Sequence, residues 1–133
     1  MIDIEDDLFA PLARELRESF GKINITGEYV NAPSSFPHVS VEEADNFTPK
    51  YLEDSSESEK YAEVMYEINV YSNKKTGKKR QCRDIIALID SFMVRHNFRR
   101  YSLMPVPNME NATIYRLTAR YRAITDGKTI YRK

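Results

Sequence analysis

The spacing of apolar residues changes twice between residues 61 and 123, and this change limits the possible folds more than any other feature of the chain. Apolar and polar side chains alternate over residues 61–71, as in a strand with one buried face. They recur with helical spacing over about residues 78–96, and alternation returns over 98–104 and 113–123. A helix placed between strands predicts a two-layer domain in which the helix covers one face of a sheet.

The N-terminal segment predicts a second helix. Apolar residues recur every fourth position from residue 8 to residue 20, which places them on one side of a helix. Asp6 or Asp7 is expected to cap the start of this helix, and Gly21 is expected to follow its last turn.

Two shorter strands are predicted next, over residues 23–30 and directly after Phe36-Pro37. His38 falls on the polar side of the second strand, and a lone histidine there is expected at the surface or at a strand edge. Residues 43–60 are acidic and polar with few apolar anchors, so they predict a long flexible loop. Asp126-Gly127 predicts a hairpin turn within residues 124–133, which form a last short strand or a tail.

These elements predict a single α+β domain over residues 1–133, with a mainly antiparallel β-sheet, two α-helices on one face and a long acidic loop. A length of 133 residues fits one domain with one core. The second face of the sheet is expected to be open to water, because both helices lie on the first.

Composition and motif spacing argue against several classes of protein. Twenty Lys and Arg balance twenty Asp and Glu, so no overall charge attracts the chain to nucleic acid or to an anionic membrane. Cys82 is the only cysteine, and on the apolar side of a predicted helix it is expected to be a small core residue, although basic neighbours could lower its pKa. No apolar run is long enough to span a membrane, and the acidic N-terminus is unlike a signal peptide, so a cytoplasmic protein is expected.

The chain also lacks the residue spacing of a catalytic, phosphate-loop or metal-binding motif. A nuclease would need carboxylates gathered at strand ends, whereas Asp84, Asp90 and Glu63 are scattered over the predicted elements. We therefore expect no enzyme activity, no catalytic residues, no metal and no cofactor.

Local charge indicates two candidate surfaces. The polar side of the strand at 113–123 carries three arginines, and that of the strand at 61–71 carries two glutamates. If these strands are neighbours, ion pairs across them neutralise the surface; if not, the arginines face a partner. The candidate subunit or partner interface consists of Glu63, Glu67, Arg116, Arg120 and Arg122. The candidate basic docking or DNA-facing loop consists of Lys74, Lys75, Lys78, Lys79 and Arg80.

Several short segments between residues 36 and 121 point to a family. They are Phe36-Pro-His-Val-Ser-Val-Glu-Glu, Tyr66-Glu-Ile-Asn-Val-Tyr-Ser-Asn, Gly77-Lys-Lys, Ile89-Asp-Ser-Phe-Met, Asn97-Phe-Arg-Arg, Pro105-Val-Pro-Asn and Ile114-Tyr-Arg-Leu-Thr-Ala-Arg-Tyr. Together they resemble small structural proteins of tailed bacteriophages and prophages, namely the minor capsid, tail completion and tail-terminator proteins. The likeness lies in structural segments, so it transfers no catalytic residue.

The resemblance implies a non-enzymatic virion protein. Such proteins form rings, often hexameric, at the end of the tail tube and join the tail to the head. The implied partners are other copies of the chain, the tail tube, head-connector proteins and, in passing, DNA, with no membrane. The implied location is the host cytoplasm during assembly and then the virion.

A nucleic-acid-binding module is the alternative that the residues leave open. In that case the basic loop and the arginines of residues 116–122 would form one continuous basic surface. The neutral overall charge and the lack of an RNA-recognition or helix-turn-helix pattern argue against it.

Overall fold

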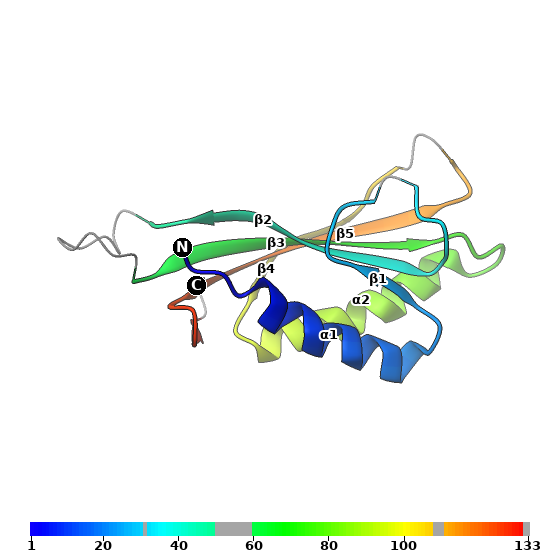
Figure 1. Cartoon of the computed structure of the whole chain (residues 1–133). Coiled ribbons are helices and arrows are strands. Elements are labelled where there is room, and N and C mark those ends of the chain that lie inside the picture. The colour runs from blue at the N-terminus through cyan, green and yellow to red at the C-terminus, as the bar shows by residue number, and fades with distance from the viewer. Residues whose placement is uncertain (31, 50–59, 108–110, 132–133) are drawn as a thin grey trace.

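The protein has two layers, a twisted sheet and a pair of helices beneath it (Figure 1). The computed structural model describes residues 1–30, 32–49, 60–107 and 111–131. In these ranges the elements are α1 (Glu5–Phe20), β1 (Asn24–Thr26), β2 (His38–Phe47), β3 (Ala62–Ser72), α2 (Lys78–Arg95), β4 (Arg99–Pro105), β5 (Tyr115–Thr125) and β6 (Ile130–Tyr131). The predicted α+β fold is confirmed.

The strand order is β1-β2-β3-β5-β4, and β6 pairs with the end of β5. Every pair is antiparallel except β1 with β2. Both helices lie on the same face of the sheet, as predicted: α2 packs on β3 and β5, and α1 packs on α2 (Figure 1). We call the helix-covered face the inner face and the opposite one the outer face.

The core lies between the inner face and the helices. On β3 and β5, alternate side chains point inward, so the predicted apolar sides are the buried ones. Phe92 of α2 and Leu12 and Leu16 of α1 fill the space below them with less than 2 % of their surface exposed. The fully buried inward residues of β3 and β5 are Ala62, Val64, Tyr66, Ile68, Val70, Ser72, Ala119, Tyr121, Ala123 and Thr125.

The two helices end as their sequences suggest, but α1 begins differently. Gly21 follows α1 with a φ of 66°, and its N–H donates to the carbonyl of Arg17. Asp6 and Asp7 lie inside the first turn, where their charges favour the positive end of the helix dipole. Ile4 occupies the cap position without a side-chain hydrogen bond, so the prediction that Asp6 or Asp7 caps the helix is wrong.

The second predicted strand is longer than expected, and the first is shorter. β2 continues through Phe47, with a bulge between Glu43 and Asp45, so the prediction of a loop beginning at residue 43 is wrong. Backbone pairing with β3 holds this polar stretch extended. The rest of the predicted loop lies mainly at residues 50–59, outside the described residues. β1 spans three residues of the predicted 23–30.

His38 is on the predicted side of β2 but is buried, with 1 % of its surface exposed, so its expected surface position is wrong. Asn24 Nδ2 lies 2.8 Å from Nδ1, and Thr26 Oγ1 lies 3.1 Å from Nε2. The Thr26 hydroxyl donates to the carbonyl of Glu28, so its oxygen accepts a hydrogen bond from Nε2–H. Nδ1 is therefore the acceptor, and the ring fits as a neutral imidazole.

This arrangement makes stability depend on pH. Burial lowers the pKa of His38 from its ordinary value of 6.5, so the unfolded chain binds a proton there more readily than the folded chain does. The contribution of His38 to stability is complete above about pH 6.5 and is lost as the pH falls toward the folded pKa. We expect urea unfolding between pH 8 and pH 5 to show a decline in wild-type stability that is smaller in His38→Gln. Parallel pH profiles for the two proteins would contradict this.

Candidate interaction surface

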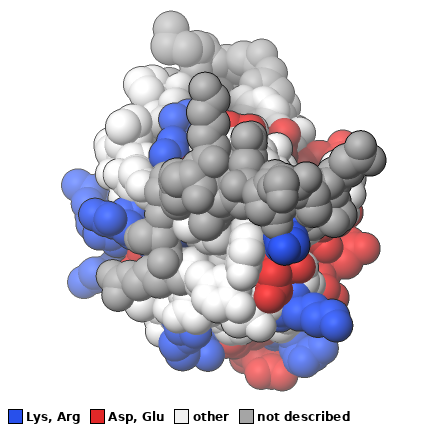
Figure 2. All heavy atoms as spheres, turned by 90° about the vertical axis from the view of Figure 1, so that its left-hand side faces the viewer, with Lys and Arg blue, Asp and Glu red and all other residues white. Residues whose placement is uncertain are grey.

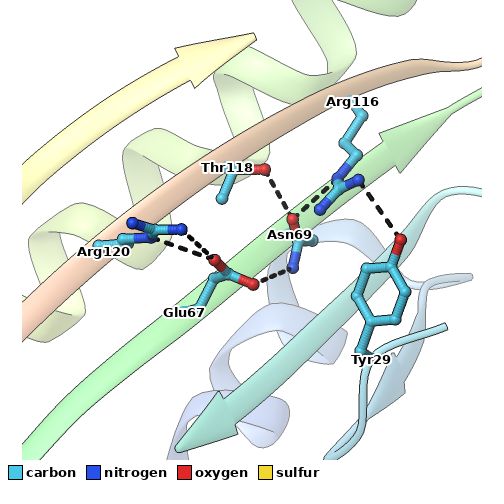
Figure 3. Close-up of polar contacts among 6 residues, drawn as sticks. All are labelled: Tyr29, Glu67, Asn69, Arg116, Thr118 and Arg120. Carbon is cyan, nitrogen blue, oxygen red and sulfur yellow. Dashed lines mark hydrogen bonds and ion pairs between the residues drawn. The ribbon is translucent and has the colours of Figure 1, made fainter. Parts of the chain in front are cut away.

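The outer face of the sheet carries four of the five residues of the predicted interface on exposed or half-buried positions, namely Glu67, Arg116, Arg120 and Arg122. Figure 3 shows the first three of them. The expectation of a fully open face needs correction. Asn69 and Thr118 are buried, and Tyr29, in the connection between β1 and β2, extends toward Arg116 over this face (Figure 3). Buried polar side chains need hydrogen-bond partners, and Asn69 and Thr118 find theirs on the outer face.

β3 and β5 are direct neighbours, and one of the ion pairs expected across these two strands is formed. Glu67 lies opposite Arg120 in the register. Arg120 Nη2 is 3.0 Å and Nε is 3.1 Å from Glu67 Oε1. The side chains are 55 % and 21 % exposed, respectively, so water screens the pair and its contribution to stability is expected to be below about 1 kcal/mol.

Asn69 organises the neighbouring polar contacts (Figure 3). Its Oδ1 accepts hydrogen bonds from Arg116 Nε at 2.9 Å and from Thr118 Oγ1 at 2.6 Å. Its Nδ2 donates to Glu67 Oε2 at 3.5 Å. The Arg116 guanidinium also lies 5.2 Å from the centre of the Tyr29 ring. Arg116 is thus held within the molecule.

Glu63 does not join this network. Its neighbour on β5 is Ile124 rather than an arginine, and only 2 % of its surface is exposed. The sequence predicts an ion pair between Glu63 and an arginine of β5 for neighbouring strands, but no ion pair joins Glu63 to Arg116, Arg120 or Arg122. Glu63 is therefore not an exposed interface charge.

Arg122 has a different environment from Arg116 and Arg120. It lies opposite Met65 on β3 and opposite Arg99 on β4. Its guanidinium stands 4.3 Å from the centre of the Tyr101 ring, and that of Arg99 is 5.7 Å from the same ring. Neither arginine is within 4.0 Å of a carboxylate in the described ranges. The described residues therefore provide no ion-pair partner for the positive charge at this edge.

Arg99 and Tyr101 were not among the predicted site residues. Their alternate positions in a predicted strand place both side chains on one face, which is a signal that the sequence does contain. The bulge between Arg100 and Ser102 adds an extra residue on β4, and this register shift is not readable from the sequence.

The opposite edge of the sheet is acidic. β2 carries Glu42 and Asp45 on the outer face, because they pair with Glu67 and Met65 of β3. Neither contacts a Lys or Arg side chain within the described residues. In a view from the end where both termini lie, the left flank carries mainly Lys and Arg, whereas most Asp and Glu lie on the right and at the bottom, where further Lys and Arg side chains lie among them (Figure 2). The two long sides of the sheet thus differ in charge.

Glu43, on the same edge strand, shows how dense the acidic charge is. Burial, followed by the like charges of Glu5 and Asp3, raises the pKa of its carboxyl. Asn46 Nδ2 at 3.3 Å and the Tyr66 hydroxyl at 3.4 Å donate to Glu43 Oε1 and act in the opposite direction. The start of α1 and the edge strand β2 therefore form one acidic region.

The residues of the candidate basic loop lie partly in the turn between β3 and α2 and partly in the first turn of α2, because the helix begins at Lys78. Lys74, Lys75, Lys79 and Arg80 are exposed, whereas Lys78 is half-buried and its Nζ donates to the carbonyl of Thr113 at 3.4 Å. Arg80 is 4.0 Å from Asp84, and both side chains are largely exposed. No acidic residue occupies the first turn of α2, so these cations stand at the positive end of the helix dipole, where they are unfavourable for stability.

Cys82 is the core residue that the sequence predicts. It is fully buried, and its Sγ lies 3.6 Å from the carbonyl oxygen of Val70. Burial raises the pKa of the thiol to about 12, so the expectation that basic neighbours could lower it is wrong.

Within the described ranges, no three His, Cys, Asp or Glu residues are placed to hold a metal ion. In those ranges no helix is both long and apolar enough to cross a membrane.

Comparison of the sequence with models of known protein families gives no match, and comparison with curated protein sequences gives none either.

The outer-face network predicts unequal effects of two substitutions. Asn69→Ala leaves Arg116 and Thr118 without their shared acceptor in a buried position, so it should lower the free energy of unfolding by about 1–3 kcal/mol. Arg120→Met removes a half-exposed ion pair and should cost less than about 1 kcal/mol. Urea unfolding of both variants measures the difference. Equal losses would mean that Asn69 does not organise the face.

Proposed function

We propose that this protein is a non-enzymatic structural protein of a tailed phage or prophage particle. It forms a ring at the end of the tail and helps to join the tail to the head. It assembles in the host cytoplasm and remains in the virion, in contact with the tail tube and head-connector proteins.

The observation that carries the proposal is the distribution of charge on a sheet face that no helix covers. A ring needs two different contact surfaces on each subunit that fit one another. The β2 side of the sheet is acidic and the β4 side is basic, and each has charges without an ion-pair partner among the described residues. The likeness of residues 36–121 to tail completion and tail-terminator proteins supplies the biological setting.

A nucleic-acid-binding module is the second candidate, and the exposed cations of the basic loop favour it. Lys74 and Lys75, in the turn before α2, and Lys79, in its first turn, are exposed to solvent. Phosphate groups bind to such clusters by releasing counterions, so the affinity falls steeply with salt. Against this candidate, the arginines at residues 116 and 120 are engaged within the molecule by Asn69 and Glu67.

Light scattering across protein concentration, combined with a DNA titration, separates the two candidates. We expect a defined multimer, hexameric above all, and no DNA affinity that depends on Lys74, Lys75 and Lys79. A monomer whose DNA affinity falls with salt and is lost in the triple Lys→Gln variant would support the binding module instead. A monomer without DNA affinity would contradict both candidates.

A further inference from the structure

Within the described ranges, the sheet has two open edges. β4 pairs only with β5 among the described strands, and it is exposed or half-buried along its whole length. The edge of β2 that points away from β3 is paired with β1 only as far as Ser40. Residues 41–47 of β2 form an edge about as long as β4. Backbone N–H and C=O groups at such edges are available for pairing with another strand.

The side chains at the two edges have opposite charge and share the outer face. Arg99 lies at the basic edge, with Arg122 directly behind it. Glu42 and Asp45 lie at the acidic edge, and Glu43 adds to its negative charge. Opposite charges that face each other across neighbouring strands stabilise the pairing, and like charges destabilise it. The charges therefore disfavour pairing of β4 with β4 or of β2 with β2.

Strand direction also fits pairing of unlike edges. β2 is antiparallel to β3, β3 to β5, and β5 to β4, so β2 is antiparallel to β4 within one chain. A second copy displaced across the strands therefore brings its β2 beside β4 in an antiparallel arrangement. Both outer faces then lie on the same side of the continued sheet, which places the arginines opposite the carboxylates.

We propose that a second copy of this chain docks the acidic edge of its β2 against the basic edge of β4, antiparallel, with Arg99 and Arg122 facing Glu42 and Asp45. The inference rests on the proposed function, since it identifies the subunit contact of the ring. The contact uses β4 of one copy and β2 of the other. The first copy therefore keeps a free β2 edge, and the second copy keeps a free β4 edge. Repetition then closes a ring when the rotation between copies allows it.

Charge reversal at one edge tests the contact. The basic-edge variant is Arg99→Glu, and the acidic-edge variant is Glu42→Lys with Asp45→Lys; these side chains contribute no ion pair within the described fold. Each variant should raise the concentration needed for assembly by about tenfold or more. The matched controls are Arg14→Glu and Glu18→Lys, at exposed positions of α1 on the other layer, and they should assemble like the wild type.

Mixing the two edge variants gives a sharper result. Alone, each variant brings like charges together at every contact. In a mixture, the β4 edge of the Arg99→Glu variant, now negative, can face the β2 edge of the Glu42→Lys/Asp45→Lys variant, now positive. The unchanged β2 edge of the first variant and the unchanged β4 edge of the second also have opposite charges and can face each other. We expect light scattering to show assembly in the mixture at concentrations where neither variant assembles alone. Circular dichroism checks that both variants are folded.

The outcomes separate this inference from the proposed function. A wild-type ring that both edge variants still form overturns the edge contact and leaves the ring intact. Variants that are folded but fail to assemble even when mixed overturn the contact as well, because complementary charge then has no effect. A wild type that is monomeric under all conditions overturns the proposed ring and the contact together.

Discussion

The antiparallel pairing of β3 with β5 fixes most of the molecule. The two strands are aligned over 11 residues without a register shift. Their alternation sends one set of side chains into the core, where they pack with Phe92 and Leu12, and the other set to the outer face. A slip of one residue would exchange the two sets and bury the arginines of β5. The apolar side of these strands therefore determines the register, and the register determines which charges meet.

Ion pairing on the outer face is uneven as a consequence of this register. At the centre of the sheet, Glu67 meets Arg120, and Asn69 holds Arg116. Toward the edges, the charges have no ion-pair partner in the part of the chain that the structure describes: Arg99 and Arg122 contact an aromatic ring, and Glu42 and Asp45 lie along the far strand. Charge that is satisfied at the centre contributes to the stability of one chain. Charge left at the edges is available to another chain and disfavours pairing of like edges.

The sequence predicts those parts of the fold that depend on local periodicity. The apolar alternation of residues 61–71 and the helical spacing of 78–96 correspond to β3 and α2. Each element buries one face in the same core, so its apolar residues recur with the period of that element. The sequence predicts a strand that ends before residue 43, because the continuation is polar and only pairing with β3 keeps it extended. It does not predict the burial of His38, because that burial depends on Asn24 and Thr26, which are 14 and 12 residues away in the chain. The register, rather than composition, decides that Glu67 meets an arginine and Glu63 does not.

The central claim is that the two oppositely charged edges of the sheet meet between copies of the chain. Amide hydrogen exchange, measured by mass spectrometry in dilute and concentrated protein, tests it directly, because exchange slows where backbone amides become hydrogen-bonded. We predict slower exchange at high concentration in β4 and in residues 41–47 of β2, with β3 and β5 unchanged because they are already paired on both sides. Protection that appears only in the helices or only in the basic loop would contradict the claim, as would exchange that is independent of concentration in an assembled protein.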